Sequence, residues 1–232
     1  MNETRAVCII PARGGSKRIP RKNVRSFRGR PILEWSVCAA LNTGLFDRVM
    51  VSTDDEEIAD VARAAGAEVP FLRSSKASDD YATTSEVLLE VLGRYSRSGD
   101  QFTLGCCLYP TAPFVTAQDL ESGFDILIGG GFSAVMPVAA YSYPIWRSLK
   151  RDGSGRVVLN WPENLNSRSQ DLPPAYHDAG QWYWFRTVDF LRDSVLMGPN
   201  TGSVVLSDLR VQDIDTEEDW QIAEIKHERL FK

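Results

Sequence analysis

The chain has 232 residues, 43% of them hydrophobic and 25% charged, which is the balance of a globular protein long enough for one domain with a real core. Its formal net charge of -5 argues against a nucleic-acid-binding protein, which would carry a basic excess. The chain has four cysteines, none in a Cys-x-x-Cys pair, and only two histidines. The ligand spacing of a zinc site is therefore absent from the sequence. With no signal-peptide pattern and no apolar stretch near the roughly 18 residues of a membrane span, we expect a cytoplasmic protein with no membrane partner.

Apolar runs and helical patterns alternate through the first part of the chain. We expect strands at residues 6–10, 48–52, 68–72, 102–108 and 133–138, and helices at 31–42, 54–65, 84–95 and 116–128. Asp54 is the expected N-cap of the second helix. This alternation predicts an α/β fold with a mostly parallel sheet and helices on both faces. Such sheets bind ligands at the carboxyl ends of their strands.

The pattern changes after about residue 141. Residues 146–161 form an expected hairpin with its turn at 152–155, and residues 163–177 form a long polar loop of the kind usually kept for function. Further strands are expected at 181–185, 204–206 and 210–214, and a terminal helix at 216–230. No repeat or domain linker is visible, so the whole chain is expected to be one domain.

Basic residues concentrate in one segment of this acidic chain. Residues 13–30 hold eight Lys or Arg and no acid, namely Arg13, Lys17, Arg18, Arg21, Lys22, Arg25, Arg28 and Arg30. A local basic run predicts a small anionic ligand at that end rather than a long polyanion.

The loop after the first strand, residues 11–17, is the strongest candidate for holding phosphate. Its glycine pair lets backbone N–H groups approach an anion, and Arg13 and Lys17 supply charge. It is not a P-loop, because Lys17 is followed by Arg18, and no Gly-x-Gly-x-x-Gly occurs here. A basic solvated turn is the alternative; the position after the first buried strand, with Lys22-Asn23 following, favours a triphosphate-binding loop.

Two further constellations carry possible chemistry. In a strand the side chains of Asp213 and Asp215 would face one side and could hold Mg²⁺, although surface acids or a helix cap are alternatives. Polar and aromatic residues at 168–184 are typical of a sugar site. Within that stretch Trp182 and Trp184 suit a core or dimer contact as well as a ligand, and His177 suits a structural role as well as a base.

Together these motifs resemble the CMP-sugar-acid synthetases, the cytidylyltransferases of nonulosonic acids. The matching segments are residues 10–17, 21–23, 52–58, 78–84, 109–113 and 213–217, with Arg73. The resemblance runs nearly the full length. It implies a Rossmann-like nucleotidyltransferase sheet in a single domain, residues 1–232, with residues 141–177 inserted as a small dimerisation hairpin and sugar-side loop.

The resemblance implies that CTP and a nine-carbon sugar acid give a CMP-sugar and pyrophosphate with Mg²⁺ as cofactor. Within the family the chain is most similar to the members that use pseudaminic acid. The reasons are residues 16–23, residues 168–173 leading to 176–181, and Tyr109, which stands where sialic-acid members typically carry Gln. Enzymes for N-acetylneuraminic or legionaminic acid remain alternatives, as does a non-catalytic CTP-binding module. A homodimer is implied, in which one subunit's loop could complete the other's sugar pocket.

Site residues are carried over position by position. The implied catalytic residues are Arg13, Lys17 and Lys22. The implied nucleotide-binding residues are Ala12, Arg13, Gly14, Gly15, Ser16, Lys17, Asn23, Arg73 and Thr84. The implied sugar-binding residues are Tyr109, Arg168, Gln170 and Tyr183, and the implied Mg²⁺ ligands are Asp213 and Asp215.

Overall fold

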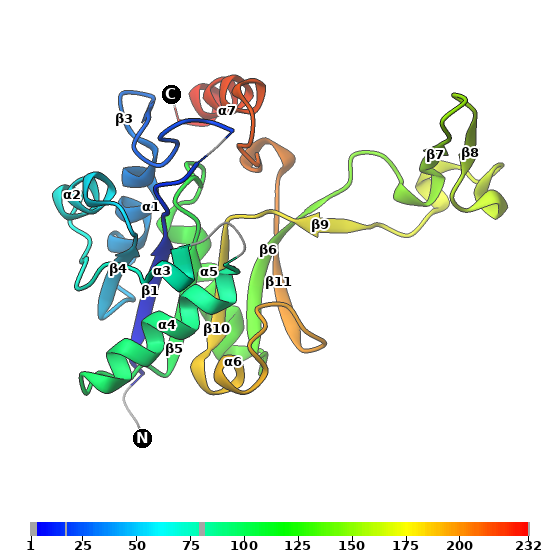
Figure 1. Cartoon of the computed structure of the whole chain (residues 1–232). Coiled ribbons are helices and arrows are strands. Elements are labelled where there is room, and N and C mark those ends of the chain that lie inside the picture. The colour runs from blue at the N-terminus through cyan, green and yellow to red at the C-terminus, as the bar shows by residue number, and fades with distance from the viewer. Residues whose placement is uncertain (1–3, 17, 79–81, 232) are drawn as a thin grey trace.

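A seven-stranded sheet forms the centre of the computed structural model, which describes residues 4–16, 18–78 and 82–231 (Figure 1). The strand order is β11 (Thr201–Leu206), β6 (Ala134–Ala140), β10 (Trp182–Arg186), β5 (Leu104–Leu108), β1 (Ala6–Pro11) and β4 (Arg48–Ser52), with β9 (Tyr176–Asp178) paired to β6. β1 pairs in parallel with β4 and β5, and β6 with β11, whereas β10 is antiparallel to β5 and β6. Only β9 and β10 therefore oppose the others, which confirms the mostly parallel sheet.

Helices cover both faces of the sheet, as predicted. Cys8 and Ile10 of β1 pack in the core shared with α1 (Ile32–Leu41), α2 (Glu56–Ala64) and α5 (Ala117–Gly129). Val7 and Ile9 pack on the opposite face, against α4 (Thr84–Arg97) and α6 (Thr187–Asp193). Burial on both faces explains why β1 reads as a continuous apolar run. The sequence did not reveal α6, because a helix of seven residues is too short to show a period.

The longer helices begin at side-chain caps. Thr83, Thr116 and Thr216 start α4, α5 and the terminal helix α7 (Glu217–Leu230) with capping boxes. The predicted cap of α2 was wrong: Asp55, not Asp54, accepts the Ile58 N–H, at 3.0 Å. Asp54 instead accepts the Gly14 N–H, also at 3.0 Å. The cap therefore leaves one acid free to hold the loop after β1.

Two predicted strands are absent from the described residues. Residues 68–72 form only a single bridge, Met50 to Glu68, and Pro70 lacks the N–H that would continue the pairing. Residues 210–214 follow the short turn η4 (Asp208–Arg210) without joining the sheet. Side chains bond the carbonyls of this segment in place of a strand: Gln181 donates to Arg210, Lys226 to Val211 and Lys22 to Ile214.

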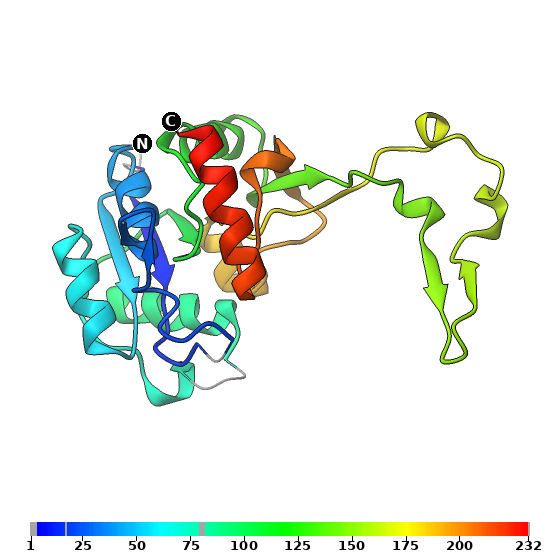
Figure 2. The same ribbon diagram turned by 90° about the horizontal axis from the view of Figure 1, so that it is seen from above.

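An arm projects from the sheet between β6 and β9 (Figures 1 and 2). It holds the predicted hairpin, formed by β7 (Leu149–Arg151) and β8 (Val157–Leu159), and the short turns η1 (Ile145–Arg147), η2 (Pro162–Asn164) and η3 (Ser169–Asp171). None of residues 141–178 is buried. The remaining elements are β2 (Ser26–Phe27), β3 (Arg30–Pro31) and α3 (Ser75–Ser78). In the described part of the chain, no helix has the length and apolar character needed to cross a membrane.

A buried histidine in α7 predicts a pH-dependent stability. His227 is 4% exposed among Phe27, Trp35 and Phe114, and its Nε2 atom has no hydrogen-bond partner in the structure. Burial, with Arg28 and Arg30 nearby, lowers its pKa from 6.5 to about 4.

The unfolded chain therefore takes up a proton between about pH 6.5 and pH 4 that the folded chain does not. This contribution to stability is complete above pH 6.5 and falls as the pH drops. We expect a loss of about 2 kcal/mol between pH 8 and pH 5 in urea unfolding. The variant His227→Phe should lack this part of the pH dependence, and equal pH dependence in both proteins would contradict the assignment.

Candidate active site

Backbone and side-chain bonds hold the loop after β1 in place. The Ala12 N–H donates to the Ser52 carbonyl at 2.9 Å, and Asn23 Nδ2 donates to the Arg13 carbonyl at 2.9 Å. Gly14 lies so close to α2 that a Cβ there would come within 2.8 Å of the Asp55 carboxylate. The glycine is therefore required by close packing. Its N–H, which the sequence assigned to phosphate, donates to Asp54 in this structure.

Most of the basic run is engaged by carboxylates. The ion pairs are Arg18–Asp215, Arg21–Asp55, Lys22–Asp215, Arg25–Glu217, Arg28–Glu228 and Arg30–Glu34. Arg21 also pairs with Glu57 and has the left-handed backbone angle φ 56°, which is uncommon for a residue with a side chain. The interpretation of the whole run as an anion site was therefore too broad. Lys17, one of its predicted catalytic members, lies outside the described residues.

Lys22 joins the opening loop to the acidic motif near the C-terminus. Its Nζ donates to the Ile214 carbonyl at 2.6 Å and lies 3.6 Å from Asp215 Oδ1. The Lys22 side chain is 19% exposed, so its charge acts with little screening by water. Two segments nearly 200 residues apart in the sequence thus lie in contact.

Asp213 and Asp215 flank Ile214, which is 1% exposed and anchors the segment. Partial desolvation, and then the charge of Asp215, raises the pKa of Asp213 above its usual range, although Asp213 is exposed at the surface. No group of three or more acids, histidines or cysteines suited to a metal occurs among the described residues. Two neighbouring carboxylates do fit Mg²⁺, which commonly takes one or two carboxylates and completes its shell with water and substrate phosphates.

The predicted nucleotide-side residues are held by the protein itself. Arg73 is 9% exposed and donates to Ser52 Oγ at 3.2 Å and to the Ser52 and Ala77 carbonyls. Burial lowers its pKa. The Thr84 hydroxyl lies 3.3 Å from the hydroxyl of Tyr109. The structure therefore links a residue predicted for the nucleotide to one predicted for the sugar.

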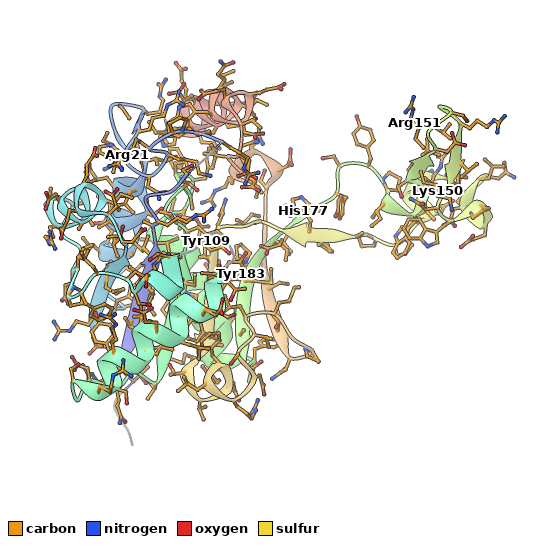
Figure 3. The ribbon with its side chains drawn as sticks, in the orientation of Figure 1. Arg21, Tyr109, Lys150, Arg151, His177 and Tyr183 are labelled. Atoms are coloured by element: carbon orange, nitrogen blue, oxygen red, sulfur yellow. The ribbon has the colours of Figure 1, made fainter. Side chains whose placement is uncertain are left out.

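A pocket of about 550 Å³ opens beside Tyr109 and Tyr183, whose ring centroids are 5.5 Å apart (Figure 3). It lies where the carboxyl end of β5 meets the start of antiparallel β10. The Tyr183 hydroxyl donates to Asp178 Oδ2 at 2.7 Å, and the Gly180 N–H donates to Asp178 Oδ1 at 2.7 Å. Burial raises the pKa of both tyrosines, so both hydroxyls remain protonated and able to donate. Asp213 also lines this pocket.

The structure does not bring Arg168 and Gln170 to Tyr109 and Tyr183. Arg168 is exposed on the arm and pairs with Asp171 at 2.7 Å, while Gln170 borders a groove between the two chain segments that enter the arm. In Figure 3, by contrast, His177 lies where the arm joins the sheet, and its Nδ1 is 2.9 Å from the Asp178 carbonyl. The expected sugar loop is thus divided between the arm and the sheet.

Sequence reasoning missed other residues of the pocket. Asp178 stood in the stretch singled out as a sugar site but was not chosen as a contact, although an acid between a histidine and a glycine turn was a visible signal. Lys226 lines the pocket from α7, and Asp208 from the turn before it. Neither had a sequence signal, because each reaches the pocket only through tertiary folding.

Comparison with known proteins places this site in context. The family model described as Cytidylyltransferase matches residues 7–127. A pseudaminic acid cytidylyltransferase of Campylobacter jejuni is 38% identical over 97% of this chain and 99% of its own length. A CMP-N,N'-diacetyllegionaminic acid synthase of Legionella pneumophila is 31% identical over 95% of each chain.

Solved structures show the same fold. A CMP:2-keto-3-deoxy-manno-octonic acid synthetase complexed with CTP superposes with a TM-score of 0.69 at 16% identity and covers 97% of this chain and 99% of that one. A 4-diphosphocytidyl-2C-methyl-D-erythritol synthase of Anaerococcus prevotii gives 0.65 at 14% identity, over 97% of this chain and 99% of that one.

Proposed function

Because this chain belongs to the cytidylyltransferase family, we propose that it transfers CMP from CTP to pseudaminic acid, a nine-carbon 2-keto sugar acid, and releases pyrophosphate. One observation of the structure carries the proposal: Lys22 bonds Ile214 of the acidic motif while its neighbour Asn23 bonds Arg13 of the loop after β1, so the proposed phosphate loop and the two carboxylates lie close together. The choice of sugar is supported by the relatives with that printed name, whose length this chain covers almost completely.

In the proposed reaction the anomeric hydroxyl of the sugar attacks the α-phosphorus in line, and pyrophosphate leaves. Such a transfer needs mainly positioning and charge stabilisation. Arg13, Lys17 and the backbone of residues 14–16 would bind the β- and γ-phosphates. Lys22, held by the Ile214 carbonyl, would stabilise charge at the α-phosphate. Tyr109 and Tyr183 would orient the sugar on the other side.

We propose Asp213 and Asp215 as the residues that would hold Mg²⁺. When bound, the metal would supply positive charge to the phosphate oxygens. Asp215 also pairs with Arg18 and Lys22, so it helps to position these two cations, which follow the loop after β1. Ala12 and Asn23 hold the loop's shape, and Arg73 and Thr84 are the proposed cytidine side.

The arm supports the proposal of a homodimer. It has no buried residue from 141 to 178, yet it exposes large apolar side chains, with Tyr143 84% and Leu165 63% exposed. Apolar and aromatic surface of this kind is typical of an interface. A second copy of the chain would cover it and could bring Arg168 and Gln170 of the arm to the pocket of its partner.

A pyrophosphate-release assay with purified protein, CTP and Mg²⁺ tests the function. We expect turnover with pseudaminic acid and much less with legionaminic or N-acetylneuraminic acid. Higher turnover with either of those two acids would contradict the proposal that pseudaminic acid is the substrate. Binding of CTP without pyrophosphate release from any of the three would identify a non-catalytic nucleotide-binding module instead.

A further inference from the structure

The sugar-side pocket has an unusual distribution of charge. Three carboxylates line it, those of Asp178, Asp208 and Asp213, and among the described residues that line it Lys226 is the one lysine or arginine. A ligand that carries its own carboxylate is repelled by the acids. Within one chain, the orientation of such a ligand therefore depends on where this lysine lies.

In the part of the chain that the structure describes, two carbonyls hold Lys226 in place and no acid pairs with it. Its Nζ donates to the Val211 carbonyl at 2.8 Å and to the Asp208 carbonyl at 3.2 Å. An ammonium group has three N–H donors, so one remains for a ligand. These bonds fix the position of Nζ without neutralising its charge, in contrast to the paired arginines of the basic run.

Chain connectivity places this cation next to the proposed reacting centre. Val211, which accepts a bond from Lys226, is two residues before Asp213. In a 2-keto sugar acid the carboxylate and the anomeric hydroxyl are attached to the same carbon. A cation that holds the carboxylate here would therefore leave the hydroxyl facing the Asp213 side, where the α-phosphate would lie.

The other side of the pocket suits the neutral part of the sugar. Asp178 already accepts from Tyr183 and Gly180, and each of its oxygens retains a lone pair for a further donor. Hydroxyl and amide N–H groups are donors of that kind, whereas a carboxylate would be repelled. The two ends of the pocket thus select opposite ends of one ligand.

We propose that Lys226 binds the carboxylate of the sugar acid and so orients its anomeric hydroxyl, the role that the sequence assigned to Arg168 and Gln170. This inference rests on the proposed function. It assigns a binding residue in α7 that no sequence motif marks.

The test is a double-mutant-type cycle in which the charge is removed either from the Lys226 side chain or from the carboxylate of the ligand. We measure kcat/KM for pseudaminic acid and for its uncharged methyl ester with the wild type and with Lys226→Gln. The wild type should prefer the acid by about 10–100-fold, the worth of a charged hydrogen bond, and the variant should show little preference. KM for CTP should stay within about twofold in the variant, since CTP binds elsewhere.

Two further variants serve as controls. Arg229→Gln removes a cation from the same helix outside the pocket lining and should keep the full preference for the acid. Thermal unfolding is compared for all variants. If Lys226→Gln does not fold, Lys226→Met, which keeps the aliphatic stem, takes its place.

Several outcomes would overturn the inference. Loss of the preference in Arg168→Gln together with its retention in Lys226→Gln would assign the carboxylate to the arm. Equal losses for CTP and sugar acid in Lys226→Gln would indicate a structural role only. If the wild type turns over no sugar acid, the proposed function fails; if it is active and Lys226→Gln behaves like it, only this inference fails.

Discussion

Asp213→Asn is expected to lower kcat of CMP transfer by roughly two to three orders of magnitude, because a bound metal contributes several kcal/mol of charge stabilisation. The substitution should also raise the Mg²⁺ concentration needed for half-maximal rate. Among the described residues Asp213 makes no ion pair, so its removal leaves the surrounding contacts intact. Steady-state rates over a Mg²⁺ titration measure both effects.

Variants of two other aspartates distinguish the loss of metal binding from the loss of other contacts. Asp215→Asn removes a proposed ligand and also the partner of Arg18 and Lys22, so both the Mg²⁺ dependence and KM for CTP should change. Asp60→Asn removes an exposed carboxylate of α2 and should have little effect on turnover. Full activity of Asp213→Asn at low Mg²⁺ would refute its role as a metal ligand.

Lys22→Met is expected to lower kcat by roughly 10²–10³-fold, with a smaller change in KM for CTP, because removing one preorganised group that stabilises transition-state charge has a cost of this size. Methionine keeps the length and apolar character of the stem while removing the charge. Single-turnover rates at saturating CTP measure the chemical step directly.

Arg25→Met is the matched control from the same basic run. Arg25 pairs with Glu217 at 2.5 Å and stacks over the Trp220 ring, so its loss should lower stability but leave kcat near that of the wild type. If Arg25→Met lowered kcat as much as Lys22→Met, the proposed role of Lys22 in stabilising the transition state would be refuted.

The basic run, residues 13–30, shows that a charge pattern in the sequence does not reveal which charges are paired in the fold. Eight cations without an acid between them suggested a ligand, because the sequence shows only neighbours along the chain. In the part of the folded chain that the structure describes, at least six of the eight have carboxylate partners, from α1, the start of α2, α7 and the segment before α7. These pairs join segments distant in sequence, so no local pattern could indicate them.

The sugar side shows the same limit. Tyr109 and Tyr183 were chosen from the sequence and do meet, because both lie at the junction of β5 and β10, two strands that could be located by their apolar character. Arg168 was chosen from the same stretch and lies on the arm instead. The resemblance implied an insertion at residues 141–177, but it did not show that Arg168 projects on the arm, away from Tyr109 and Tyr183.

The sequence by itself determined most strands of the sheet, its longer flanking helices, and the positions of the loop after β1 and of the acidic motif, because each depends on local periodicity, capping or a short motif. Only the tertiary structure decided which cations of the basic run pair with carboxylates and which residues line the pocket beside Tyr109 and Tyr183. Lys22 bonds Ile214 and Lys226 bonds Val211 across the fold, and contacts of that kind depend on how distant segments pack. The physical reason is that charge acts through space, whereas a sequence records only distance along the chain.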